Sequence, residues 1–426
     1  MIRLPRRYPL VLLVLLIPLS LFLYANFGAQ VAAWASNKIV PVTPAFGSPP
    51  HIIKPDSSQA ADGVGAQILL VSAFFPLSKS KHSMAQYSDW LSRFLGKITT
   101  PVYFFAPPDL EPTIRSIRGA LPIVIDTRFQ TAFDIPPLKG READYEKMHG
   151  WDREKEHHSP DLYAIWAAKP FLLAEALRRL RDDRGLTELG LKNTDNIEYA
   201  FWSDAGSFRR THTYASWPDL ARLDEVWKDG ETLSGMKKDE IVFFPLQHLP
   251  DVSMQLWTEN LGPIDNDVSE GSFFGGNPKV AEWWERYYYA YHDHYLAQHV
   301  FVGKDQTLIN ALFVLQPSHF ISVWHGDSDA PAALFKPATT SSDDSELLLG
   351  DCGDQWYYYQ FFLASEAERE KMTRVWDRQW YWDFWRKEWW ARKRETCRLT
   401  RTVDMLSLLR RAFGDRWNPP PSSVQF

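Results

Sequence analysis

The sequence predicts an α/β protein with a mostly parallel sheet flanked by helices. Residues 66–75 form a continuous apolar run of strand length, which is typical of a strand that is covered on both faces. After this run, apolar residues recur at the spacing of one helix face, at Met84, Tyr87, Leu91 and Phe94. Two more apolar runs, 101–106 and 121–125, follow. This alternation of strand and helix patterns favours a parallel sheet.

The elements after residue 125 continue this rhythm. Residues 128–158 are polar and charge-rich, and we interpret them as a long loop that lies over a site. Ser159 and Pro160 provide an N-cap and a first turn, and Pro170 is expected to kink or split the helix that they begin. The remaining elements are expected as strands at 197–203, 241–246 and 320–324, and as helices at 278–300, from Asp305, and within 356–390.

The composition indicates a folded protein and excludes some partners. Of the 426 residues, 45% are hydrophobic, which is enough for a large core. The net charge of -6 is mild and mixed, so nucleic acid is not expected as a partner. Aromatic residues make up 15%, which suits a large core, sugar-stacking sites or a membrane-interface belt. We therefore expect the aromatic helices within 356–390 either to pack on the sheet or to rest on a lipid surface.

The N-terminal region predicts a membrane anchor. Residues 8–37 carry no charge, and the apolar part, 9–27, is long enough to cross a bilayer as a helix. Arg3, Arg6 and Arg7 precede it, so the positive-inside rule predicts a cytosolic N-terminus and type II topology. The alternative is a cleaved signal peptide, because Ala33 and Ala35 offer a small-x-small site. In both cases the folded part is expected outside the cytosol.

The chain is therefore divided into five parts. The expected parts are a cytoplasmic tail at 1–7, a transmembrane signal anchor at 8–27, a Pro/Ser-rich stalk at 28–64, an α/β domain at 65–345 and a C-terminal, aromatic-rich helical extension at 346–426. Cys352 and Cys397 are the only cysteines, which excludes a Cys-rich zinc module. Whether they pair in an oxidising lumen stays open.

Acidic residues at the ends of predicted strands are the first candidates for a site. Asp204 directly follows a predicted strand, and open α/β sheets bind ligands at the carboxyl ends of their strands. Glu270 opens a glycine-rich loop that ends in Gly275 and Gly276, and these glycines either let the backbone approach a ligand or serve the turn only. Asp305 stands at a helix start, and His325 follows the last predicted strand. Asp204 with His325 suits a hard divalent metal. Each residue also has a structural alternative, such as a helix cap.

Several segments together resemble the HtrL/YibB family, which is linked to surface-polysaccharide loci in bacteria and has eukaryotic relatives. The resemblance covers about residues 66 to 330 and lies in Val71-Ser72-Ala73-Phe74-Phe75, in 163–170, in Trp202-Ser203-Asp204-Ala205-Gly206, in 270–276 and in Asp305-Gln306. It implies the GT-A fold of nucleotide-sugar glycosyltransferases, a Rossmann-type α/β architecture.

A more distant resemblance links the chain to family 8 glycosyltransferases. Asp305-Gln306 with Asn310 is similar to their Asp-Gln-x-x-x-Asn segment, and His325 with Lys336 is similar to their late His-Gly-Lys-Pro element. Those enzymes carry an Asp-x-Asp metal motif, whereas Gly206 stands at the second acidic position here. The two-carboxylate grip on manganese is therefore missing.

The resemblance implies a type II membrane glycosyltransferase of the Golgi or ER that moves a sugar from a nucleotide sugar to a glycan or glycoconjugate acceptor. Its expected cofactor is Mn²⁺ or Mg²⁺, held by Asp204 and His325. Asp305 and Glu270 are the candidate bases. The donor is expected to contact Lys169, Arg209, Gly275, Gly276, Gln306 and Lys336.

Two alternatives belong to other classes. The first is a non-catalytic lumenal binding or scaffold protein that keeps the fold, and it is motivated by the missing second aspartate. The second is a metal-dependent hydrolase, which has little support because the sequence has no dense His/Asp cluster.

Overall fold

The computed structural model describes residues 67–77, 79–182, 184–330, 352, 355–383 and 397–426. The predicted tail, anchor and stalk lie outside these residues, as does Lys336. Within the described ranges, no helix is long and apolar enough to cross a membrane.

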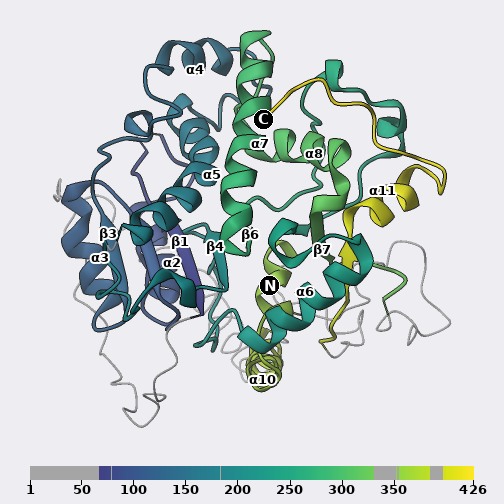
Figure 1. Cartoon of the computed structure of the whole chain (residues 1–426). Helices are drawn as coiled ribbons and strands as arrows, with labels where there is room; N and C mark the ends of the chain where they lie inside the picture. The colour runs from purple at the N-terminus through teal and green to yellow at the C-terminus, as the bar shows by residue number, and fades with distance from the viewer. Residues whose placement is uncertain (1–66, 78, 183, 331–351, 353–354, 384–396) are drawn as a thin grey trace, which may run out of the picture. The chain divides into compact units, whose positions relative to one another are not determined.

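The strands of the described part form one eight-stranded sheet in the order β3-β2-β1-β4-β6-β5-β7-β8 (Figure 1). They are β1 (Ile68–Ala73), β2 (Val102–Phe105), β3 (Ile123–Asp126), β4 (Tyr199–Ser203), β5 (Val242–Leu246), β6 (Phe273–Gly276), β7 (Phe320–Trp324) and β8 (Thr402–Asp404). Strands β1 to β4 pair in parallel, as do β5 and β7, whereas β6 and β8 run antiparallel to their neighbours. The predicted α/β class with a mostly parallel sheet is thus confirmed.

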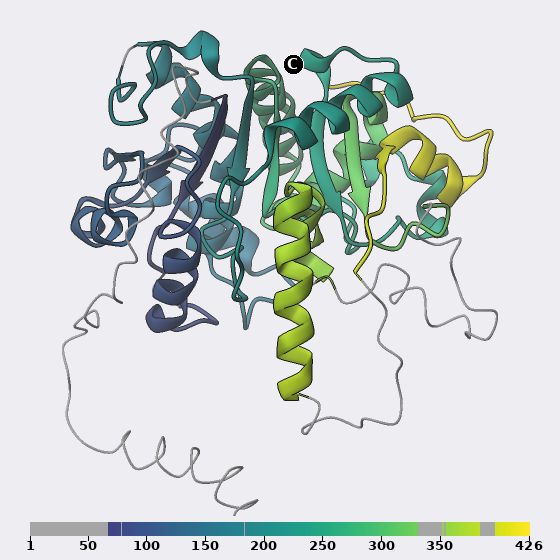
Figure 2. The same ribbon diagram turned by 90° about the horizontal axis from the view of Figure 1, so that it is seen from below.

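Helices cover both faces of this sheet (Figures 1 and 2). One face packs against α2 (Met84–Phe94), α3 (Glu111–Arg118), α6 (Leu220–Ser234), α9 (Tyr358–Phe362) and α10 (Glu366–Asp383). The other packs against α4 (Glu142–His149), α5 (Pro160–Arg181), α7 (Pro278–Ala297), α8 (Asp305–Leu315) and α11 (Met405–Phe413). Two hydrophobic cores therefore lie on opposite sides of the sheet.

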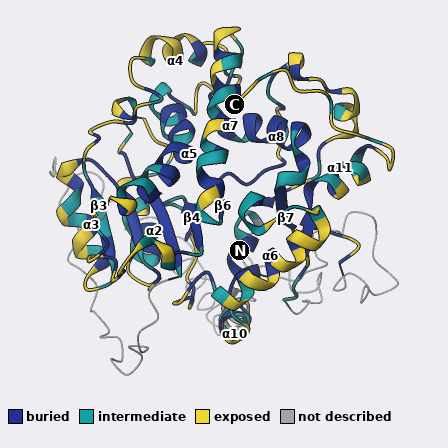
Figure 3. Cartoon of the chain, in the orientation of Figure 1, coloured by how far each residue is buried: buried dark blue, intermediate teal, exposed yellow. Residues whose placement is uncertain are grey.

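The burial of β1 on both faces explains why its sequence is almost entirely apolar. Leu69 and Val71 point into the core that contains α5, whereas Ile68 and Leu70 point into the core that contains α2. Alternate residues of a strand face opposite sides of the sheet, so a strand covered on both faces is mostly apolar, and Ser72 is the one polar residue of β1. Figure 3 shows this arrangement as buried strands beneath helices whose outer surfaces are exposed.

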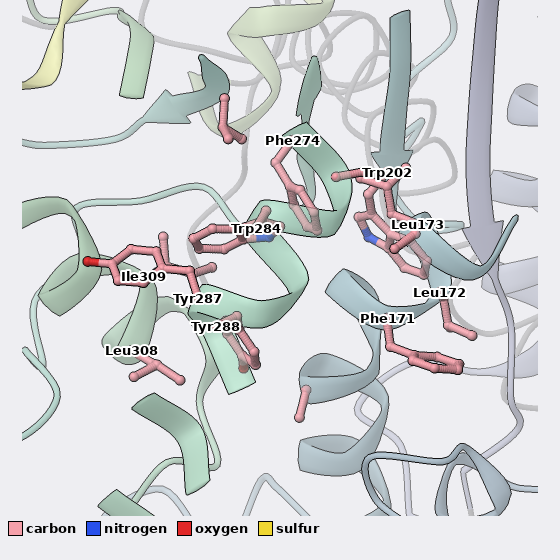
Figure 4. Close-up of a cluster of buried hydrophobic side chains, with 14 of the residues drawn as sticks. Phe171, Leu172, Leu173, Trp202, Phe274, Trp284, Tyr287, Tyr288, Leu308 and Ile309 are labelled. Atoms are coloured by element: carbon pink, nitrogen blue, oxygen red, sulfur yellow. The ribbon is translucent and has the colours of Figure 1, made fainter. Parts of the chain in front are cut away.

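Three local expectations are corrected by the structure. The 128–158 stretch contains helix α4, so it is not one continuous loop. Helix α5 continues through Pro170 and is not split. Its neighbours Phe171, Leu172 and Leu173 pack into the core (Figure 4), and we attribute the tolerance of a proline, which costs about 3 kcal/mol inside a helix, to this packing. The end of the glycine-rich segment is not a loop but strand β6.

The C-terminal region is part of the same sheet and cores. Strand β8, which the sequence did not predict, extends the sheet beside β7. Tyr359 and Phe362 are buried against the sheet, so the described part of the aromatic region packs on the protein. Cys352 and Cys397 form a disulfide across 45 residues, which answers the question of their pairing.

Candidate functional site

The order in which the chain adds strands to the sheet reverses between β1 and β4. The chain leaves β1 toward β2 and β3 on one side, and β4 then pairs with the other side of β1. Such a switch point opens a crevice at the carboxyl ends of the two strands, where α/β proteins bind ligands. Asp204 is the first residue after β4 and therefore stands at this crevice.

A buried lysine joins two of the predicted acids there. Lys169 extends from α5, which packs on β1 and β4, and its side chain is 4% exposed. Its Nζ lies 3.2 Å from Asp204 Oδ1 and 2.9 Å from Asp305 Oδ2. It also donates a hydrogen bond of 3.0 Å to the carbonyl oxygen of Gly271. Elements far apart in the sequence thus meet at one ammonium group.

Hydrogen bonds with neighbouring backbone and side-chain groups hold Asp204 and Asp305 in place. The Asp204 amide donates to the Ser272 carbonyl at 2.8 Å, and Trp202 Nε1 donates to Asp204 Oδ1 at 2.6 Å. Asp305 begins α8, and its Oδ1 accepts from the Gln306 amide at 2.9 Å. Both aspartates therefore have set orientations before any ligand arrives.

The loop before β6 must come very close to Asp305. A Cβ atom at Gly271 would lie 3.1 Å from Asp305 Oδ2, which is tighter than most contacts of this kind. The Gln306 side chain holds the same loop by donating to the Ser269 carbonyl at 2.7 Å. Gln306 therefore positions the loop that carries Glu270.

The pKa values of Lys169 and Glu270 are both raised, but for different reasons. Burial lowers the pKa of Lys169, but Asp204 and Asp305 outweigh this and raise it above the ordinary value. Burial raises the pKa of Glu270 to about 7, although the amide of Ser272 donates to its carboxylate at 3.2 Å. Lys169 is thus charged at neutral pH, and Glu270 titrates near it.

The cluster is buried at one end and open at the other. The side chains of Lys169 and Asp305 are 4% and 7% exposed, whereas that of Asp204 is 32% exposed. Beyond Asp204, the 204–214 segment borders a pocket of about 340 Å³, a volume that includes open solvent. Its lining consists of Ser207, Arg209, Arg210, Thr211, His212, Tyr214, Cys352, Tyr357, Gln360, Met372 and Trp376.

Arg209 lines this pocket and lies five residues after Asp204 in the chain. Its guanidinium lies 4.7 Å from the Trp90 ring and 5.5 Å from the Tyr357 ring. Its Nε donates to the Gly206 carbonyl at 3.2 Å, and within the described residues it makes no ion pair with a carboxylate. Arg209 is thus a fixed positive charge that remains open to an anion.

The end of the 128–158 segment contacts loops at the same edge of the sheet. Lys79 Nζ, from the loop after β1, donates to the Lys155 carbonyl at 3.5 Å. Lys304 Nζ, just before α8, lies 3.6 Å from Glu154 Oε2. The segment therefore bridges the loops that follow β1 and precede α8, as expected for a loop beside the site.

The structure does not bring His325 to this cluster. His325 follows β7, which is the third strand from β4 and thus roughly 14 Å away at ordinary strand spacing. Its ring packs edge-on against Tyr358 at 4.9 Å, and burial lowers its pKa to about 4. The shared site predicted for Asp204 and His325 is therefore corrected.

The side chains that are described do not fit the predicted manganese or magnesium ion. Within the described ranges, no group of three or more His, Cys, Asp or Glu residues could hold a metal. Two of the nearby carboxylates, those of Asp204 and Asp305, are already paired with Lys169. The disagreement lies in the donor set, because a hard divalent ion requires several free oxygens.

Gly275 and Gly276 lie within β6, between β4 and β5. A Cβ atom at Gly275 would lie 2.2 Å from the Ala200 carbonyl oxygen, and one at Gly276 would lie 2.7 Å from that of Ile241. We attribute these glycines to close strand packing. The predicted donor contacts at these two positions have no support in the geometry.

Sequence reasoning did not find two arrangements near the site. One is the pairing of Lys169 with both aspartates, although a lysine in the middle of an apolar helix was an available indication. The other is Asp152, whose Oδ2 accepts from Tyr163 Oη at 2.5 Å and lies 2.7 Å from His158 Nδ1. Asp152 and His158 fall in a loop that showed no motif, and Tyr163 opens the 163–170 segment, whose resemblance indicated no such contact.

The chain matches no protein-family model and no curated protein sequence.

Proposed function

We propose that this chain is a glycosyltransferase-like enzyme that transfers a sugar from a nucleotide sugar to a glycan or glycoconjugate acceptor. The observation that carries the proposal is the buried Lys169 cluster at the carboxyl end of β4, beside a pocket with arginine and aromatic side chains. The resemblance to GT-A glycosyltransferases points to the same reaction.

The positive charge around the crevice supports an anionic donor. Arg209 and Arg210 follow β4 and line the pocket, and Lys79 and Lys81 lie in the loop after β1. Arg209 in particular has no carboxylate partner among the described residues, so its charge is available to a diphosphate. Guanidinium groups bind phosphate oxygens through paired N–H donors.

Glu270 is the better of the two candidate bases. A base works best when its pKa lies near the working pH, and burial raises the pKa of Glu270 to about 7. Asp305 is less suited because its carboxylate is ion-paired with Lys169. In a direct displacement, the acceptor hydroxyl gives its proton to Glu270 while its oxygen bonds to the anomeric carbon. The bond from that carbon to the diphosphate breaks, and the diphosphate keeps the electron pair.

The proposed location is the lumen of the Golgi or ER, with residues 8–27 as a type II anchor. The Cys352–Cys397 disulfide supports this location, because disulfides persist in oxidising compartments and are rare in the cytosol. Alkaline carbonate extraction tests the anchor. The protein should stay with the membrane pellet, and its release into the supernatant would contradict the anchor.

The alternative of a non-catalytic binding protein has one observation in its favour. The Lys169 ammonium group is ion-paired with Asp204 and Asp305 and donates to the Gly271 carbonyl, so its charge is balanced without a ligand. A binding protein would take up a nucleotide sugar without consuming it.

Turnover separates the two functions. Full-length protein in detergent is incubated with a panel of UDP- and GDP-sugars and with glycan acceptors, and release of the nucleoside diphosphate is measured. The enzyme proposal expects release with at least one donor, and Glu270→Gln should reduce it by about 100-fold or more. Donor binding without release by the wild type would favour the binding protein.

A further inference from the structure

The ammonium group of Lys169 occupies the position between the two aspartates of the site. Its Nζ is ion-paired with Asp204 Oδ1 at 3.2 Å and with Asp305 Oδ2 at 2.9 Å, and it donates a hydrogen bond of 3.0 Å to the Gly271 carbonyl. The side chain is 4% exposed and is held on a helix in the core. Lys169 therefore cannot swing out to solvent without leaving two carboxylates unpaired.

A divalent cation would have to displace this ammonium group. Mg²⁺ and Mn²⁺ bind carboxylate oxygens at about 2.0 to 2.2 Å, and Mg²⁺ demands a nearly octahedral set. One oxygen of Asp204 and one of Asp305 are already ion-paired with Lys169.

Positive charge for the phosphates is available outside the cluster. Arg209 lines the pocket, its guanidinium lies over the rings of Trp90 and Tyr357, and it has no ion pair with a carboxylate in the described part of the chain. An arginine in this setting supplies the charge that a metal supplies elsewhere. The site thus has one cation for its own carboxylates and another for a ligand.

We propose that Lys169 is the resident cation of this site and that the diphosphate of the donor binds without a divalent metal. The inference rests on the proposed function for the identity of the ligand, but the statement about Lys169 stands on its own geometry. Lys169 acts here as a positioning residue, since its partners are Asp204, Asp305 and Gly271 and not the donor.

The first test measures donor binding with and without metal. Full-length protein is titrated calorimetrically with the nucleotide sugars, once with EDTA and once with Mn²⁺. We expect the two dissociation constants to agree within about threefold. A donor that binds about tenfold or more tightly with Mn²⁺ than with EDTA would overturn the inference while leaving the proposed function intact. No binding under either condition would count against the proposed function, and the second test would then decide on Lys169.

The second test needs no donor. Binding of Mn²⁺ to the protein alone is followed by the electron paramagnetic resonance signal of the free ion. The wild type should show no saturable binding below about 1 mM, whereas Lys169→Met should bind Mn²⁺ because two carboxylates lose their partner. The double variant Lys169→Met with Asp204→Asn should lose this binding again.

Two results would contradict the role of Lys169. The first is saturable Mn²⁺ binding by the wild type that Asp204→Asn removes. The second is a folded Lys169→Met variant that binds no Mn²⁺. If Lys169→Met does not fold, the wild type and Asp204→Asn still decide, because both keep the ammonium group.

Discussion

Two buried charge clusters lie at the carboxyl edge of the sheet, one after β4 and one after β7, and they differ in how completely they are closed. After β7, Asp327 is fully buried and both of its oxygens are taken, by Arg401 Nε at 2.7 Å and Arg411 Nη1 at 2.8 Å. Both arginines come from the C-terminal region that contains β8 and α11. This cluster fastens the C-terminal region to the sheet.

The cluster after β4 has the opposite character. Its lysine and Asp305 are buried, but Asp204 is 32% exposed beside a pocket and next to Arg209. Two groups of ion pairs at the same edge of one sheet can therefore have different roles. We infer that the partly exposed cluster, which has Arg209 without a carboxylate partner nearby in the chain, is the candidate for ligand binding. The fully paired cluster at Asp327 has a structural role.

The largest expected effect comes from removing the ammonium group at the open cluster. Lys169→Met leaves Asp204 and Asp305 without their cation and should lower the free energy of unfolding by about 3 to 5 kcal/mol. Urea denaturation of the full-length protein in detergent measures it.

Lys238→Met is the matched control. Lys238 also pairs with two carboxylates, those of Glu198 at 3.4 Å and Asp224 at 3.5 Å, but its side chain is 33% exposed. Its loss should cost about 1 kcal/mol or less. Equal losses in the two variants would show that burial does not distinguish the cluster after β4.

The second effect is a pH dependence of stability that comes from Glu270 of the open cluster. The pKa of Glu270 is about 7 in the folded protein, against an ordinary value of 4.5. Because the folded value is raised, its contribution to stability is fully present below pH 4.5 and is lost as the pH rises through 7. The loss amounts to about 3 kcal/mol.

Glu270→Gln tests this contribution because it removes the titrating group. The free energy of unfolding is measured between pH 5 and 8. The variant should lack the part of the pH slope that Glu270 contributes, whereas turnover of the wild type should rise over the same range as the base loses its proton. Identical slopes for wild type and variant would contradict the assignment of the pKa to Glu270.

The third effect tests the closed cluster. Asp327→Asn should lower the free energy of unfolding by about 2 kcal/mol, less than the fully buried case because Arg401 and Arg411 are 46% and 30% exposed. Donor binding should not change. A loss of donor binding in a folded Asp327→Asn protein would contradict the distinction between the cluster after β4 and the cluster after β7.

The smallest effect on stability is expected at the pocket. Arg209 is exposed, so Arg209→Gln should change the free energy of unfolding by only about 0.5 kcal/mol. Donor affinity should nevertheless fall about tenfold, because a charged contact to the diphosphate is lost. Calorimetric titration measures it, and an unchanged dissociation constant would remove Arg209 from the site.

The sequence predicted the architecture because buried strands and capped helices leave local patterns. The apolar run of β1 and the cap of α5 by Ser159, which accepts from the Leu162 amide, are examples. Strand β6 was missed because two of its four residues are glycines, which indicate a loop when only local propensity is considered.

The candidate site was predictable in part, for the same reason. Asp204 follows a strand, Asp305 begins a helix and Glu270 lies in the loop before β6, and the topology of the sheet brings these positions together. His325 also follows a strand, but the strand order, which the sequence does not reveal, puts β7 far from β4. The contact of Lys169 with two aspartates depends on helix packing and on tertiary distances that no local pattern contains.

The most direct test of the account is a thermal-shift titration of three proteins with the panel of UDP- and GDP-sugars. Bound ligand raises the melting temperature by mass action. We predict that at least one donor raises the melting temperature of the wild type and of Asp327→Asn, and that no donor raises that of folded Asp204→Asn. A donor that stabilises Asp204→Asn as much as the wild type would contradict the placement of the ligand site at the end of β4.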